Sequence, residues 1–163
     1  MLTPFGALTL LPFVLAIGIW VSWSDMRFMK IPNKAVIALA LVWLIVGVFL
    51  VPINVWLWGW ALAAIVLVLG FVSNAAGLIG AGDAKFAAAM APFFVNANIK
   101  LVLLLFASCL LGAFAAHRLA RMVPALRGAT MEWASWTHKD FPMGLALSGT
   151  LIFYILALVR SLL

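Results

Sequence analysis

Long runs without a charged side chain are the feature that most constrains how this chain folds. A helix that crosses the hydrocarbon core of a membrane takes about 20 apolar residues. Six apolar segments fit such crossings, at residues 5–24, 35–52, 55–74, 85–97, 99–117 and 143–161. Charged residues make up only 9% of the 163 positions, whereas soluble domains contain about 25%. We therefore predict an all-α, polytopic membrane bundle of about six transmembrane helices, formed by residues 1–163 as a single domain.

The fourth predicted span, 85–97, is shorter than the membrane core is thick. It begins after the glycine-rich turn Gly80-Ala81-Gly82. A helix of this length can start below the membrane surface, so that its first residues lie inside the protein.

The ten Lys and Arg residues set the predicted orientation. Six spans leave Lys100 and Arg160 on one side and place the other eight opposite them: Arg27, Lys30, Lys34, Lys85, Arg118, Arg121, Arg127 and Lys139. The larger set is expected in the cytoplasm, with both termini outside. Basic loops of this kind meet anionic membrane lipid, so the formal charge of +6 does not predict nucleic acid as a partner.

The residues that usually hold metals are few and scattered. Cys109 is the only cysteine, which excludes an intramolecular disulfide and a multi-cysteine metal site. His117 and His138 belong to the one long connection, predicted from His117 to Asp140, and their spacing fits no usual ligand pattern. We predict no metal and no organic cofactor.

Two of the four acidic residues need an explanation. Glu132 and Asp140 lie in the predicted cytoplasmic connection or at its edge, but Asp25 closes the first apolar run and Asp83 opens the short fourth span. A carboxylate costs about 2.5–3.5 kcal/mol at the membrane centre and less near an interface, and it is usually kept for function.

A structural interpretation of each aspartate is also open. Asp25 can pair with Arg27 or Lys30 at a helix end, and Asp83 can cap a helix and pair with Lys85. Considered together, two carboxyl groups at one depth suggest proton sharing, in which one group acts as base and the other as acid. Such a pair suits peptide hydrolysis. Gly80 and Gly82, which lack a Cβ, permit unusual backbone angles and close approach by an extended substrate or by the other aspartate-bearing helix.

Two motifs resemble those of the type IV prepilin peptidases. In the first, Asp25 is followed by Ile31-Pro32-Asn33. In the second, Gly80-Ala81-Gly82-Asp83 is followed by Lys85, which resembles the GxGD motif. The segment Phe141-Pro142-Met143-Gly144 also resembles the Pro-x-Gly segment of this family.

The resemblance implies a membrane aspartic endopeptidase with Asp25 and Asp83 as its catalytic residues. Its partner would be a prepilin, cut after a short basic leader at the cytoplasmic face of a bacterial inner membrane. The chain has no four-cysteine insert, which the larger, N-methylating members contain, and therefore looks more like the short peptidases of Flp (tight-adherence) pili. The residues do not indicate an oligomeric state.

Other interpretations of the same residues stay open at this point. Ile31-Pro32-Asn33 can simply open the second span, because proline starts a helix well. Lys85 can stabilise a charged aspartate or extend to the membrane interface. The whole chain can be a proton-coupled transporter, or a noncatalytic subunit of a pilus or secretion assembly.

Overall fold

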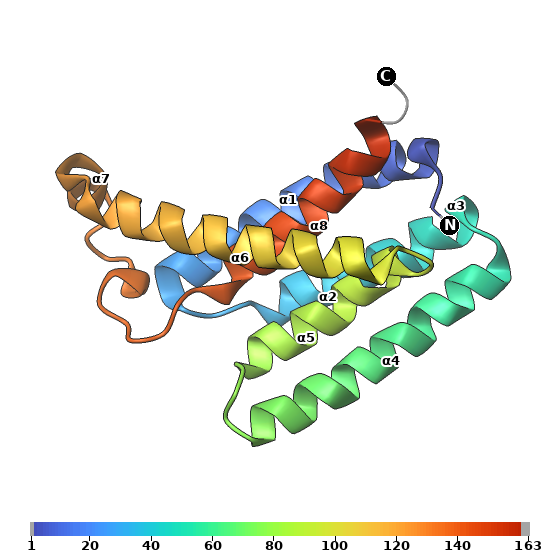
Figure 1. Ribbon diagram of the computed structural model, residues 1–163, viewed down its shortest axis with the longest axis horizontal. Helices are drawn as coiled ribbons and strands as arrows, with labels where there is room; N and C mark the ends of the chain where they lie inside the picture. The colour runs from blue at the N-terminus through green and yellow to red at the C-terminus, as the bar shows by residue number, and fades with distance from the viewer. Residues whose placement is uncertain (1, 161–163) are drawn as a thin grey trace.

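The computed structural model describes residues 2–160, which form helices and connections but no strand. Successive long helices run in alternating directions (Figure 1), which confirms the predicted all-α bundle. In chain order the elements are α1 (Pro4–Phe28), α2 (Asn33–Val42), the π-helical segment η1 (Trp43–Gly47), α3 (Val48–Leu50), α4 (Ile53–Ala75), α5 (Ala81–Met90), the 3₁₀ segment η2 (Ala91–Phe94), α6 (Ile99–Met122), α7 (Pro124–Ala129), the 3₁₀ segment η3 (Ala134–Trp136) and α8 (Met143–Arg160).

Five helical stretches within residues 2–160 are long and apolar enough to cross a membrane. They are Pro4–Phe28, Asn33–Leu50, Ile53–Ala75, Ile99–Met122 and Met143–Arg160. The short helix predicted at 85–97 is α5 with its 3₁₀ extension η2, and it packs against α2 and α4. The chain is therefore a multi-pass membrane protein with one shortened helix inside the bundle.

Helix α6 is longer than the apolar segment 99–117 predicted. Its N-cap residue is Asn98, whose side chain accepts a hydrogen bond from the backbone N–H of Lys100 at 3.0 Å. It continues to Met122 because residues 118–122 are mostly good helix formers, and Pro124 then starts α7. The connection predicted from His117 to Asp140 is thus shorter than expected and contains α7 and η3.

The bundle centre is formed by α1 and α8, and α6 packs on the other face of α8. In the part of the bundle where α4 packs against η2, Trp43 of η1 is fully buried beside Phe93, with ring centroids 5.3 Å apart. A Cβ at Gly59 would lie 2.9 Å from the Trp43 ring, so a glycine lets α4 approach. The indole N–H of Trp56 donates to the Trp43 carbonyl at 3.1 Å and ties α4 to the π-helical segment.

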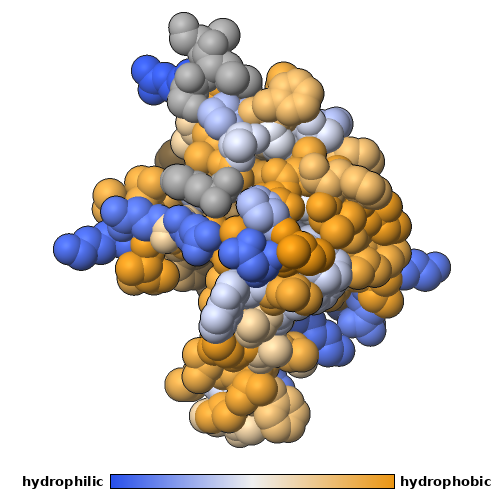
Figure 2. Space-filling view, turned by 90° about the vertical axis from the view of Figure 1, so that its right-hand side faces the viewer, coloured by the Kyte–Doolittle hydropathy of each residue, from blue (hydrophilic) through white to orange (hydrophobic). Residues whose placement is uncertain are grey.

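Apolar side chains cover most of the face shown in Figure 2, and hydrophilic residues are confined to a few projections. Many large apolar residues on α4 and α6 are exposed, including Phe71, Leu104 and Leu111. An apolar surface of this extent suits lipid rather than water.

Candidate active site

Asp25 lies in the last turn of α1 and is 5% exposed. The helix ends at Phe28, because Met29 adopts a left-handed conformation (φ 50°) and its N–H donates to the Asp25 carbonyl at 2.8 Å. The Ser24 hydroxyl donates to the Lys30 carbonyl at 2.9 Å and fixes the turn that follows. The end of α1 therefore holds the Asp25 carboxyl group inside the bundle.

The backbone of Gly144 supplies the hydrogen-bond partner of Asp25. The Gly144 N–H, in the first turn of α8, donates to Asp25 Oδ2 at 2.7 Å. An N–H at a helix N-terminus stabilises a carboxylate through both the hydrogen bond and the helix dipole. A Cβ at position 144 would lie 2.9 Å from both Cβ and Oδ2 of Asp25, so this contact requires glycine.

Asp83 is the third residue of α5, three positions after the N-cap residue Gly80. Its carboxyl group reaches back to the backbone N–H of Gly80, as the acidic residue of a capping box does. A Cβ at Gly80 would lie 2.6 Å from Asp83 Oδ2. Because Asp83 belongs to the helix that Gly80 caps, the close approach of an extended substrate or of the other aspartate-bearing helix stays a prediction.

The prediction of unusual backbone angles at these glycines is wrong for Gly80, which has φ −69° and ψ 145°. The positive φ in this connection belongs to Gly77, at 73°. A Cβ at Gly82 would meet Ile31 Cβ at 3.4 Å, which is an ordinary contact. Gly82 thus places the start of α5 against the connection that follows α1.

Asp25 and Asp83 line one pocket with a volume of about 530 Å³. This volume lies in the range of small-molecule and peptide-side-chain sites, about 300–1,000 Å³. The walls come from the end of α1, the connection before α5 and the segment that leads into α8. When both carboxyl groups are ionised they repel each other across this pocket.

The remaining residues of the two predicted motifs also meet. Lys85 Nζ donates to Asn33 Oδ1 at 3.4 Å, so the second motif contacts the first. Pro32 is the N-cap residue of α2, as the local interpretation of this segment predicted, and Ile31 is buried. Lys85 forms no ion pair with Asp83. Its hydrogen bond to Asn33 instead connects α5 to α2.

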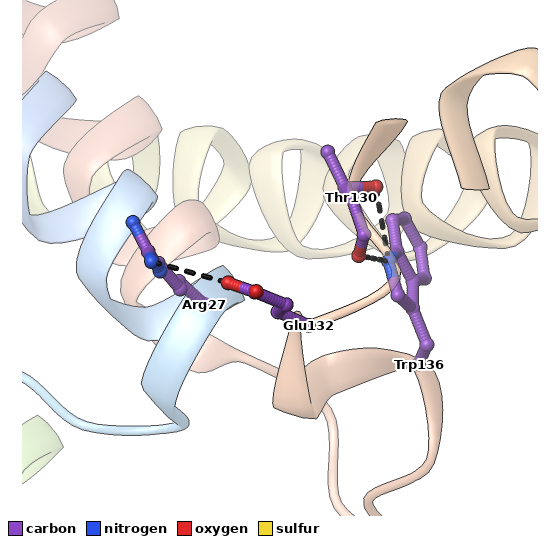
Figure 3. Close-up of polar contacts among 4 residues, drawn as sticks. All are labelled: Arg27, Thr130, Glu132 and Trp136. Atoms are coloured by element: carbon purple, nitrogen blue, oxygen red, sulfur yellow. Dashed lines mark hydrogen bonds and ion pairs between the residues drawn. The ribbon is translucent and has the colours of Figure 1, made fainter. Parts of the chain in front are cut away.

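The basic residues that were predicted to form ion pairs with the aspartates do not form them. Arg27 pairs with Glu132 at 3.4 Å on the exposed surface (Figure 3). His138 Nδ1 lies 3.6 Å from Asp140 Oδ2. Within residues 2–160 neither Asp25 nor Asp83 takes part in an ion pair. A simple role as half of a structural salt bridge is therefore not observed.

The segment before α8 contributes residues that sequence reasoning did not assign to the site. His138, Lys139 and Asp140 line the same pocket as the two aspartates. Asp140 was placed in the connection, where a carboxylate costs little, and its only signal was its position beside Phe141-Pro142-Met143-Gly144. Among the described residues no group of three or more His, Cys, Asp or Glu side chains is arranged to hold a metal ion.

Comparison with known proteins gives one match. A family model described as the type IV leader peptidase family matches residues 12–117, which include α1 through most of α6 and both aspartates. No curated protein and no solved structure matches the chain.

Proposed function

The chain belongs to the type IV leader peptidase family, and from this premise we propose that it is a membrane aspartic endopeptidase that removes the basic leader of Flp-like type IV prepilins. Membership of the family makes the chain a peptidase that acts on prepilins in general. The aspartic mechanism, the Flp-like substrate and the side of the membrane are the finer parts of the proposal.

One observation carries the aspartic mechanism: two carboxyl groups from separate helices line one pocket and have no ion-pair partner within residues 2–160. The predicted ion pairs with Arg27, Lys30 or Lys85, which would give the two aspartates a purely structural role, are absent from the described residues. The Asp25 carboxyl group is instead held by the backbone N–H of Gly144, and the Asp83 carboxyl group lies beside the backbone of Gly80. Backbone donors orient a carboxylate without consuming its charge.

The proposed reaction follows from the repulsion between the two groups. Asp25 and Asp83 share one proton, since they resist ionising together, and the titration belongs to the pair. The ionised member takes a proton from a water molecule, whose oxygen attacks the scissile carbonyl carbon. The protonated member donates to the carbonyl oxygen, and a proton then passes to the leaving amine as the C–N bond breaks. This chemistry involves no metal or organic cofactor.

The charge distribution supports a cytoplasmic active site in a bacterial inner membrane. Arg27 in α1, Lys30 in the connection that follows and Lys85 in α5 are close in sequence to the aspartates, at the end of the bundle that the positive-inside rule assigns to the cytoplasm. Both termini would then lie outside. In this proposal residues 1–163 act as one domain, surrounded by membrane lipid and without nucleic acid.

The test is leader removal from a coexpressed Flp-like prepilin, followed by the change in electrophoretic mobility. Asp25→Asn and Asp83→Asn are nearly isosteric but supply neither the base nor the shared proton, so each is expected to stop processing. Glu132→Gln is the matched control, because Glu132 is an exposed carboxylate near the same end of α1 and outside the pocket. Normal processing by either Asn variant would refute the dyad.

A further inference from the structure

A second pocket, of about 550 Å³, lies where α6, α7 and η3 meet, away from the two aspartates. Arg121 and Arg127 contribute its positive charge, and Thr137 contributes a hydroxyl group. Its apolar wall includes Met122, Met131 and Trp136. The proposed peptidase chemistry uses none of these residues.

The aromatic wall of this pocket is held in place by its neighbours. The Trp136 indole N–H donates to the Thr130 carbonyl at 2.8 Å and to the Thr130 hydroxyl at 3.1 Å (Figure 3). His117 stacks on the Trp136 ring at 5.1 Å and 15°, and Trp133 stacks at 5.9 Å and 8°. Trp136 is only 3% exposed. A ligand would therefore meet a preformed surface rather than a mobile loop.

The positive charge of the pocket is not neutralised by the protein. The ion pairs observed among residues 2–160 are Arg27–Glu132 and His138–Asp140, and neither involves Arg121 or Arg127. A guanidinium group presents N–H donors in a planar fork that matches phosphate oxygens. Two such groups on one pocket favour a phosphate-bearing anion.

The location of the pocket indicates which kind of phosphate-bearing molecule it binds. Helix α6, a candidate membrane span, ends at Met122. Met122 and Met131, which line the pocket, have large apolar side chains that are 77% and 78% exposed. Exposed apolar groups beside arginines and tryptophans are typical of segments that lie at the membrane interface. The same site thus offers contacts to acyl chains and to a charged headgroup.

We propose that this pocket, which we call the arginine pocket, binds the phosphate headgroup of an anionic phospholipid between Arg121 and Arg127, with its acyl chains along Met122 and Met131. The Arg27–Glu132 pair links α1, close after Asp25, to the segment between α7 and η3. Lipid in the arginine pocket would therefore brace the segment that also leads into the aspartate pocket.

The test measures lipid affinity of the whole purified chain in neutral detergent, by titration with phosphatidylglycerol or phosphatidylcholine and thermal unfolding. Phosphatidylglycerol is expected to raise the Tm of the wild type, and phosphatidylcholine is not. Arg121→Gln and Arg127→Gln are each expected to weaken phosphatidylglycerol affinity about fivefold, the effect of one basic residue near an anionic surface. Peptidase activity plays no part in this measurement, so its outcome is separate from that of the proposed function.

The matched control is Arg118→Gln, because Arg118 lies on α6 one turn before Arg121 but packs over Phe114 and does not line the pocket. Its affinity should stay within about twofold of the wild type. An equal loss in all three variants would indicate diffuse surface charge and overturn the site. Equal stabilisation by soluble glycerol 1-phosphate would overturn the assignment to lipid. If Arg121→Gln does not fold, Arg127→Gln decides alone, because Arg127 is exposed and its replacement leaves the core of the bundle unchanged.

Discussion

Replacement of Gly144 by Ala tests whether the N-terminus of α8 positions the Asp25 carboxyl group. The new Cβ would lie 2.9 Å from Cβ and Oδ2 of Asp25, whereas ordinary contacts begin at 3.4 Å. Asp25 Cβ is attached directly to the backbone of α1, so it cannot rotate away. Either α8 or the end of α1 that carries the carboxyl group must therefore move, by about half an ångström or more.

The expected cost follows from the interactions at stake. The hydrogen bond from the Gly144 N–H to a charged carboxylate is worth about 1.5–3 kcal/mol, and overpacking of a dense core costs about 1–3 kcal/mol. A displacement approaching 1 Å at a reacting group lowers a rate by about 100-fold. We therefore expect Gly144→Ala to slow leader removal by roughly that factor, while the bundle still folds with a lower Tm.

The assay is the time course of leader removal in membranes that contain equal amounts of each variant, together with thermal unfolding in detergent. Gly149→Ala is the control on the same helix, because its Cβ would lie 3.7 Å from Cys109 Sγ, an ordinary contact. It should process at nearly the wild-type rate. If Gly144→Ala also does so, α8 does not position Asp25 in the reacting state and the reasoning from this contact fails.

Three further predictions concern neighbouring contacts. Gly80→Ala places a Cβ 2.6 Å from Asp83 Oδ2 and should slow leader removal at least about tenfold, whereas Gly82→Ala, 3.4 Å from Ile31 Cβ, should keep most of the rate in the same assay; the reverse order would contradict the geometry. Lys85→Met and Asn33→Leu should show a coupling energy of about 0.5–1.5 kcal/mol in a double-mutant cycle of unfolding free energies, and strictly additive effects would argue against their 3.4 Å hydrogen bond. Glu132→Gln should change the unfolding free energy by less than about 1 kcal/mol, since its pair with Arg27 is solvent-exposed; a larger change in thermal unfolding would show that this pair does more than a surface ion pair.

The two aspartates could be selected from the sequence because an acidic residue beside an apolar run is costly and therefore conspicuous. Their position at one depth was expected from the alternation of helices, but the pocket that they share was not. Their hydrogen-bond partners could not be identified in this way. Gly144 is 119 residues from Asp25 and acts through its backbone N–H. The residue type at position 144 reflects only the lack of room for a Cβ, so it does not indicate the hydrogen bond.

The end of α6 shows a different limit of sequence reasoning. Apolar character falls at His117 and Arg118, but helix propensity does not, so a boundary drawn from hydropathy came too early. The consequence is that His117 is buried in a helix and stacked on Trp136 rather than lying in a connection. Hydropathy indicates where a chain can enter lipid, and propensity and proline indicate where its helix stops.

The contact between α1 and α8 has a consequence for the synthesis of the protein. Asp25 is synthesised first, and the N–H that holds it, from Gly144, is synthesised 119 residues later. During translation the nascent chain therefore carries both aspartates while the pocket lacks the segment before α8. Under the proposed function, the chain becomes an active peptidase only when α8 has inserted and packed against α1. An incompletely inserted chain therefore does not cleave other proteins in the membrane.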